Sequence, residues 1–273
     1  MLVYYYYYHY YSYHIPDLPD DIFLCKPYYG ADELLCSTDN SFYSVRNYTT
    51  AKPVVERIKS NDDPDCTCNS QNSLLDGFCF SGISDFKILS NGKILVIHSA
   101  ENCIRELDIK KKEVTPIGGK CRLDCNRKEC YNDAALSAAL FDRPYSFADR
   151  SNDSSYYILD NNGIRKVFNE SVTTLTSLGP SRRLPSRPYS IVSLNESLKV
   201  ITSIGLCTIN ITSTNSTCIS INDIKTDYNF RKEIFFAASR DRKVAVLYEK
   251  RSSNPLRFAL TDDGYFRLSD PGM

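Results

Sequence analysis

The pentapeptide Arg143-Pro144-Tyr145-Ser146-Phe147 returns later in the chain as Arg187-Pro188-Tyr189-Ser190-Ile191. The two copies start at positions 143 and 187 and therefore lie 44 residues apart. A period of about 40 to 45 residues is typical of proteins that repeat one small four-stranded sheet, or blade. The repeat therefore predicts a β-propeller.

Short runs rich in β-branched and aromatic residues follow each copy, with turn-forming residues between them. We call the four expected strands of a blade a, b, c and d. After the first copy they are expected at 145–148, 155–159, 164–168 and 172–178. After the second copy they are expected at 190–193, 198–202, 206–211 and 217–221.

Three further sets of strands extend the pattern in both directions. The set at 84–89, 93–97, 103–109 and 113–117 includes Asn91-Gly92, a strong hairpin signal. A fainter set lies at 21–25, 33–37, 42–46 and 53–58, and a last one at 234–238, 243–248, 256–260 and 265–268. We therefore expect an all-β propeller with five visible blades of a six-bladed ring, and a chain that is a piece of a longer protein.

The stretch from Asn132 to Gly179 resembles the NHL-repeat family of propellers. Residues matching the family's segment before strand a are Asp133, Ala134, Ala138, Phe141, Arg143, Pro144 and Tyr145. Residues matching its strands b to d are Tyr156, Tyr157, Ile158, Leu159, Asp160, Asn161, Ile164, Arg165, Lys166, Val167, Val172, Thr173, Thr174 and Leu175. The resemblance implies an Asp at the end of strand b, but the preceding blade has His98 there, which we expect to face the turn. A β-sandwich remains the alternative fold.

Composition limits the kinds of partner. The chain has 33 basic and 33 acidic residues, so no global field attracts nucleic acid or an anionic membrane. No apolar run is long enough to span a bilayer. Residues 1–15 form a tyrosine-rich, low-complexity extension, and we expect one propeller domain over 16–273.

Cysteines and glycosylation sequons both favour an extracellular or secretory-lumen location, although no clear signal peptide is present. The chain has eleven cysteines and six Asn-x-Ser/Thr sequons. The sequons, which are candidate glycosylation sites, start at Asn47, Asn152, Asn169, Asn195, Asn210 and Asn215.

Two insertions between blades, at 59–82 and 119–142, contain most of the cysteines. These are Cys66, Cys68, Cys79, Cys121, Cys125 and Cys130. We expect disulfides among them, with a structural zinc as the competing interpretation because Cys121 and Cys125 have zinc-ligand spacing. Symmetric hairpins predict the Cys207–Cys218 and Cys25–Cys36 disulfides, the first across a two-residue turn at Thr212-Ser213, and leave Cys103 as the unpaired thiol.

The standard nucleophile and phosphate-binding motifs are absent, so we expect a binding protein that is not an enzyme and needs no cofactor. One alternative is a metal-dependent lactone hydrolase, with Asp85, Asp149 or Asn195 as ligands in place of turn formers. A second is an intracellular propeller that binds RNA through Lys110, Lys111 and Lys112 or through Arg182 and Arg183, although the lysines also read as a solvated turn.

Strand polarity assigns the loops to two ends of each blade. The a–b and c–d turns leave one end, and the b–c turns and blade connections leave the other. All six sequons fall at the first end, whereas both insertions and the basic segment Arg182, Arg183 and Arg187 fall at the second. We therefore expect a glycan-covered face and an opposite face that binds a protein or glycan, with no nucleic acid and no membrane span.

Overall fold

The computed structural model consists of β-strands, with one short 3₁₀ helix among the residues it describes. The described residues are 2–7, 9–15, 17–19, 22, 24–28, 32–50, 52–59, 73–75, 78, 80, 82–121, 132–149, 155–177, 188–202, 205–220, 234–238, 245–249, 257–260 and 265–267. The chain divides into two compact units, Met1–Tyr145 and Ser146–Met273, and we describe each by itself.

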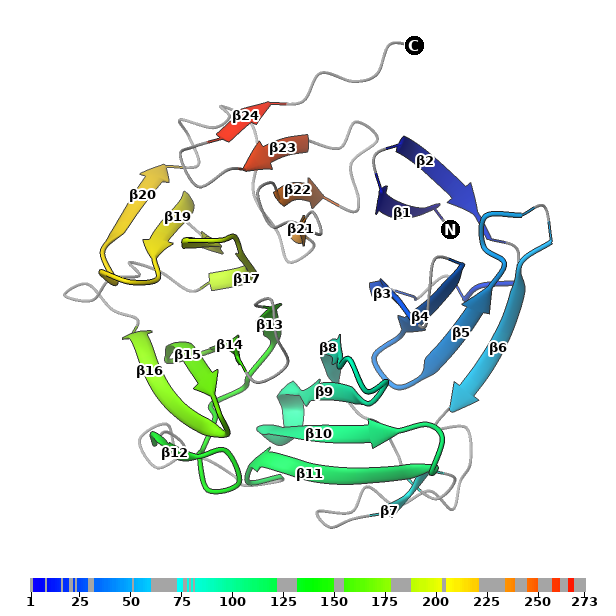
Figure 1. Cartoon of the computed structure of the whole chain (residues 1–273), viewed down its shortest axis with the longest axis horizontal. Coiled ribbons are helices and arrows are strands. Elements are labelled where there is room, and N and C mark those ends of the chain that lie inside the picture. The colour runs from blue at the N-terminus through cyan, green and yellow to red at the C-terminus, as the bar shows by residue number, and fades with distance from the viewer. Residues whose placement is uncertain are drawn as a thin grey trace. The chain divides into compact units, whose positions relative to one another are not determined.

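The first unit contains two repeated sheets, each a meander of four antiparallel strands that neighbour one another in sequence (Figure 1). The strands of the first sheet are β3 (Leu24–Pro27), β4 (Glu33–Ser37), β5 (Phe42–Arg46) and β6 (Val54–Lys59). Those of the second are β8 (Ile83–Ile88), β9 (Ile94–His98), β10 (Cys103–Asp108) and β11 (Glu113–Gly119), with β7 (Ser73–Leu74) paired outside β11. The two-residue strand β12 (Ala134–Ala135) follows.

The second unit repeats the same meander three times. Its first sheet has β13 (Ser146–Asp149), β14 (Ser155–Asp160), β15 (Gly163–Phe168) and β16 (Ser171–Ser177). The next has β17 (Pro188–Ser193), β18 (Ser197–Thr202), β19 (Gly205–Asn210) and β20 (Ser216–Ser220). The last has β21 (Ile234–Ala238), β22 (Ala245–Glu249), β23 (Arg257–Leu260) and β24 (Tyr265–Arg267).

Alternating side chains of each strand build the core of the first unit, because successive residues of a strand point to opposite faces of the sheet. Leu35 of β4 and Phe42 of β5 belong to a buried cluster together with Phe86, Val96 and other residues of the second sheet. The Phe42 ring meets that of Phe86 edge to face, with the ring centroids 5.5 Å apart. Leu34 and Cys36, on the opposite face of β4, pack in a separate cluster. The two repeated sheets therefore hold each other by burying the face between them.

Burial in the second unit is nearly complete along the second strand of its first two sheets. Every residue of β14 and β18 is buried, as is typical of a strand covered on both faces. The first strands of neighbouring sheets contact each other, β13 with β17 and β17 with β21. Consecutive sheets of this unit therefore approach each other through their first strands.

The tyrosine-rich start of the chain forms a separate two-stranded hairpin of β1 (Leu2–Tyr7) and β2 (His9–His14). It pairs with none of the repeated sheets in the described part of the chain. The expected division at residue 15 into an extension and one propeller domain stays a prediction. In the part of the chain that the structure describes, no helix is long and apolar enough to span a membrane.

Every strand expected from the sequence in the five sets has a counterpart in the structure within a few residues. The Asn91-Gly92 hairpin also forms, with Gly92 at a φ of 83° and the Leu89 amide donating to the Lys93 carbonyl. The repeated four-stranded sheets are confirmed, whereas the number of blades in a ring stays a prediction.

Candidate functional site

The two ends of each sheet carry different connections, as the antiparallel register requires. We call the end with the a–b and c–d turns the sequon end, and the end with the b–c turns and the connections between sheets the insertion end. In the second sheet of the first unit, the b–c turn is the 3₁₀ helix η2 (Ser99–Glu101). The candidate site around Cys103 lies at this insertion end.

A disulfide between Cys103 and Cys121 joins the start of β10 to a residue two positions after the end of β11. Cys103 pairs in the sheet with Gly119, so the end of β11 lies beside the start of β10, and Cys121 is only two residues further on. Cys103 is fully buried and Cys121 is half-buried. The disulfide therefore fixes the first residues of the 119–142 insertion to the sheet.

This disulfide corrects the expectation that Cys103 is the unpaired thiol. The prediction was wrong because it assigned all insertion cysteines to bridges among themselves. The hairpin register carried the missing signal, since it places the first cysteine of the insertion next to the first residue of strand c.

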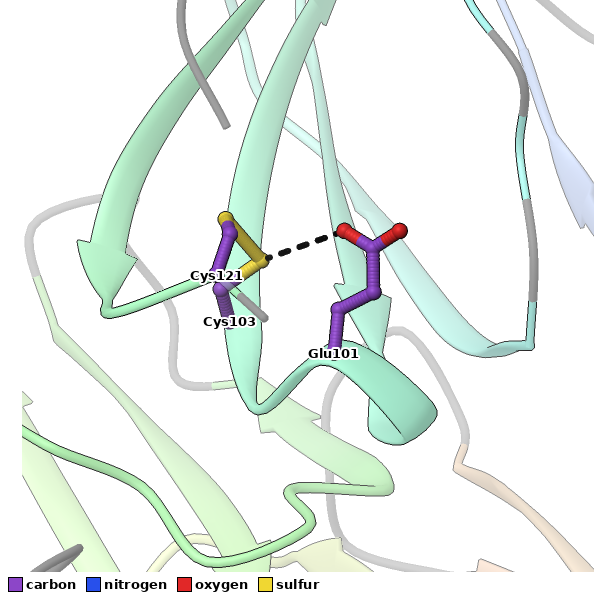
Figure 2. A group of neighbouring side chains, drawn as sticks. All are labelled: Glu101, Cys103 and Cys121. Carbon is purple, nitrogen blue, oxygen red and sulfur yellow. Dashed lines mark hydrogen bonds between the residues drawn. A yellow bond between two sulfur atoms is a disulfide. The ribbon is translucent and has the colours of Figure 1, made fainter. Parts of the chain in front are cut away.

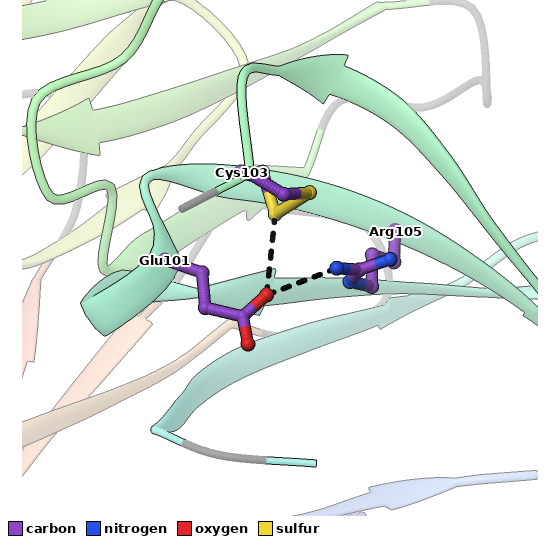
Figure 3. The surroundings of a disulfide bond; sticks show 4 residues. Glu101, Cys103 and Arg105 are labelled. Atoms are coloured by element: carbon purple, nitrogen blue, oxygen red, sulfur yellow. Dashed lines mark hydrogen bonds and ion pairs between the residues drawn. A yellow bond between two sulfur atoms is a disulfide. The ribbon is translucent and has the colours of Figure 1, made fainter. Parts of the chain in front are cut away.

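Glu101 and Arg105 complete a buried cluster around the disulfide. Figure 2 shows the Glu101 side chain pointing from the 3₁₀ turn toward the two sulfur atoms, with the Glu101 Oε2 atom 3.9 Å from the Cys103 Sγ atom. Figure 3 shows the same carboxylate also facing Arg105, whose Nη2 donates to Oε2 at 2.9 Å. Arg105 is fully buried, and its guanidinium lies 4.7 Å from the centroid of the Phe78 ring. A carboxylate, two sulfurs and a cation thus share one largely buried site.

The first sheet of the second unit contains a related ion pair at the same end. Asp160, the last residue of β14, lies 3.3 Å from Arg165 Nη1, and both side chains are fully buried. The Asp160 Oδ1 atom also accepts the backbone N–H groups of Asn162 and Gly163, which closes a tight turn. Burial raises the pKa of Asp160 to about 6, although Arg165 and the two backbone N–H groups act in the opposite direction.

The position of Asp160 is taken by His98 in the first unit, and the carboxylate is supplied instead by Glu101. His98 pairs with Cys103 just as Asp160 pairs with Gly163. The expectation that His98 faces the turn is wrong, because the side chain is fully buried and stacks on Phe80 with centroids 5.6 Å apart. The longer turn at 99–102 brings Glu101 back toward Arg105, so the buried arginine keeps an acidic partner.

Two further disulfides agree with the hairpin symmetry read from the sequence. Cys25 and Cys36 are directly opposed in β3 and β4 and are bonded, and so are Cys207 and Cys218 in β19 and β20. The turn after β19 is longer than the expected two residues. It spans 211–214, because the Asn210 amide donates to the Asn215 carbonyl and the Asn210 Oδ1 atom accepts the N–H groups of Thr212 and Ser213.

Five of the six sequon asparagines belong to the described residues, and all five are exposed at the sequon end of their own sheet. They are Asn47, Asn169, Asn195, Asn210 and Asn215. Asn47 and Asn169 have positive φ values of 54° and 46°, which suits their turn positions after β5 and β15. Glycosylation of these asparagines stays a prediction.

Several other predicted site residues can also be placed. Lys110, Lys111 and Lys112 are exposed in the turn between β10 and β11, as expected for a solvated hairpin. Asp85 is not a turn residue, since it lies within β8, is buried, and pairs with Lys26 at 2.8 Å. Asp149 ends β13 and Asn195 lies in an exposed turn. The predicted residues outside the described part of the chain are Cys66, Cys68, Cys79, Cys125, Cys130, Asn152, Arg182, Arg183 and Arg187.

Comparison with known proteins identifies the fold. No family model matches the chain, and no curated protein matches its sequence. Among solved structures, the virginiamycin B lyase of Staphylococcus aureus has a TM-score of 0.53 at 14% identity, over 95% of this chain and 73% of that chain. A structure of a nidogen/laminin complex has a TM-score of 0.53 at 11% identity, over 86% of this chain and 75% of that chain.

The extracellular domain of a putative one-component system from B. thetaiotaomicron has a TM-score of 0.51 at 11% identity, over 90% of this chain and 27% of that chain. These similar structures are β-propellers, and the repeated four-stranded sheets of this chain are accordingly propeller blades. Identities this low show the fold and nothing finer.

The comparisons correct one expectation. The absence of standard catalytic motifs led us to expect that the chain is not an enzyme, but the similar structures include a lyase. Propellers carry out chemistry with residues that short motifs do not describe, so the missing motifs do not exclude catalysis.

Proposed function

We propose that this chain is an extracellular or secretory-lumen propeller that binds a protein or glycan through loops at the insertion end. The observation that carries the proposal is the Cys103–Cys121 disulfide, which ties the start of a long insertion to a rigid sheet. Binding residues concentrate on loops that a rigid scaffold holds in place. A covalently fixed root lowers the cost of ordering such a loop when a ligand binds.

The sequon end also supports this proposal, because its exposed asparagines separate the candidate glycan sites from the proposed binding loops. The five described sequon asparagines are exposed there, in the turns of their own sheets or directly beside them. Glycans at these positions would cover the sequon end and leave the insertion end accessible. We include Asn152 in this set, and Arg182, Arg183 and Arg187 among the residues of the binding face.

Disulfides support the location, because cross-strand bonds between directly opposed cysteines persist in oxidising compartments. One similar structure is an extracellular domain, and another belongs to a nidogen/laminin complex. Within this proposal we also retain the finer description of the fold. The blades are of the NHL type, five are visible, and a complete ring has six.

The proposal is tested by placing a glycan on either end. Asp133→Asn with Ala135→Thr creates a sequon in the 119–142 insertion, and both residues are exposed. Lys111→Asn with Glu113→Thr creates a matched sequon at the sequon end of the same unit, again at exposed residues. Both variants and the wild type are secreted from cultured cells and applied to arrays of extracellular protein domains and of glycans.

We expect the wild type to bind at least one protein or glycan on the arrays. The glycan in the insertion should weaken that binding at least tenfold, and the glycan at the sequon end should leave it unchanged. Equal binding by the two variants would place the ligand elsewhere and contradict the proposal, as would a wild type that binds nothing on either array.

A further inference from the structure

We propose that reduction of the Cys103–Cys121 disulfide creates a binding site for a thiophilic divalent cation such as Zn²⁺, with both sulfurs and the Glu101 carboxylate as ligands. The inference does not depend on the proposed ligand-binding function. Among the described residues, these three form the one group whose potential ligand atoms lie close enough together for a metal, all within 4.8 Å of one another. Ligands of a tetrahedral zinc lie about 3.3 to 3.8 Å apart, given bonds of about 2.0 to 2.3 Å. Small side-chain rotations are therefore sufficient.

The chemistry of the site changes with the oxidation state of the sulfurs. A disulfide sulfur carries no hydrogen, so the 3.9 Å approach of Cys103 Sγ to Glu101 Oε2 is only a contact while the bond exists. A dithiol reductant breaks the S–S bond, leaves a thiol on each cysteine, and itself closes to a disulfide. Zn²⁺ then displaces the two thiol protons and binds the two thiolates.

Charge favours the metal-bound state over the bare dithiolate. Two thiolates beside Glu101 would place three negative charges in a largely buried site, which is unfavourable without a cation. A divalent ion together with the Arg105 guanidinium balances these three charges. Arg105 Nη2 already donates to the Glu101 carboxylate at 2.9 Å, the kind of outer hydrogen bond that orients a metal-ligating carboxylate.

The other two disulfides in the described part of the chain belong to no such group. Cys25–Cys36 and Cys207–Cys218 are cross-strand bonds, and no third potential ligand is grouped with either pair. They therefore provide an internal comparison. A metal at Cys103 and Cys121 would also keep the first residues of the insertion attached to β10 under reducing conditions.

The experiment uses the full-length protein, reduced with dithiothreitol and then freed of it under anaerobic conditions. Co²⁺ is titrated first, because cobalt–thiolate bonds absorb in the near ultraviolet, and Zn²⁺ is then used to displace it. We expect Glu101→Gln to weaken binding at least about tenfold, and Cys103→Ser with Cys121→Ser to remove one metal equivalent. The matched control, Cys207→Ser with Cys218→Ser, should bind like the wild type.

A measurement on the wild type keeps the test independent of folding defects in the variants. Zn²⁺ should slow alkylation of Cys103 and Cys121 at least tenfold in the reduced protein, and leave the alkylation rate of Cys207 and Cys218 unchanged. Alkylation of Cys103 and Cys121 at the same rate with and without Zn²⁺ would overturn the inference, as would equal metal affinity of the wild type and Glu101→Gln.

Discussion

The buried carboxyl of Asp160 should make the stability of this protein fall as the pH rises from acidic to neutral. Its pKa is raised from 3.8 to about 6 in the folded chain, mainly because the side chain is buried. Between these two values the unfolded chain has lost the proton that the folded chain still holds. The folded state therefore gains stability at low pH, and this contribution disappears as the pH passes 6.

The size of the effect follows from the shift. Each pKa unit corresponds to about 1.4 kcal/mol, so a shift of about two units amounts to roughly 3 kcal/mol over the full range. Between pH 4.5 and pH 7.5 the expected change is about 2 kcal/mol, because part of the transition lies below pH 4.5. The ion pair with Arg165, at 3.3 Å, lowers the pKa of Asp160, and the value of about 6 is the net result of burial and this pairing.

Urea unfolding of the wild type and Asp160→Asn at several pH values measures this contribution. The chain has no tryptophan, so far-ultraviolet circular dichroism or tyrosine fluorescence is the signal. We expect the stability of the wild type minus that of Asp160→Asn to fall by about 2 kcal/mol from pH 4.5 to 7.5. Glu170→Gln removes one exposed negative charge from the same sheet and serves as the control. A difference that stays constant or rises with pH would show that pairing with Arg165 outweighs burial.

Three further changes should destabilise the protein by amounts that the same unfolding assay can resolve. Cys207→Ser with Cys218→Ser removes a bond that closes a short hairpin, and should lower the free energy of unfolding by about 3 kcal/mol. An unchanged urea midpoint would contradict this expectation. Arg105→Met leaves the buried Glu101 carboxylate without its cation and should cost about 3 to 5 kcal/mol. Adding Glu101→Gln to Arg105→Met should recover most of that loss, and failure to recover it would show that the pair is not the cause. Gly119→Ala should cost about 2 kcal/mol, because Gly119 has a φ of 80° and an added Cβ would lie 2.9 Å from the Cys103 Cα atom. A fully stable variant would refute the placement of the end of β11 beside Cys103.

The strands could be predicted from the sequence because each one is marked locally. Within a strand, apolar residues either alternate with polar ones or form a short run. Asn or Gly residues separate consecutive strands, as at Asn91-Gly92. The Cys207–Cys218 and Cys25–Cys36 bonds were predictable for the same reason, since a simple hairpin register places the cysteines opposite each other.

The candidate site was harder to predict because it depends on details that vary between blades. The longer b–c turn decides what lies beside Cys103. The register shift between Ile104 and Arg105 is not specific to this blade, since the same shift recurs between Ile164 and Arg165. In the second unit, Asp160 marks the equivalent position directly. In the first unit, His98 occupies that position, and Glu101, three residues later, supplies the carboxylate. No sequence motif indicates that the acidic partner of the buried arginine has moved to this later residue.

We propose a disulfide-bonded propeller whose glycans and insertions lie at opposite ends of its blades, and one peptide map tests this proposal. The wild-type chain is produced through a secretory pathway, digested without reduction, and analysed by mass spectrometry for disulfides and for glycans together. We predict the pairs Cys25–Cys36, Cys103–Cys121 and Cys207–Cys218, and glycan on the exposed sequons at Asn47, Asn169, Asn195, Asn210 and Asn215. Free thiols at these six cysteines, together with asparagines that carry no sugar, would contradict it.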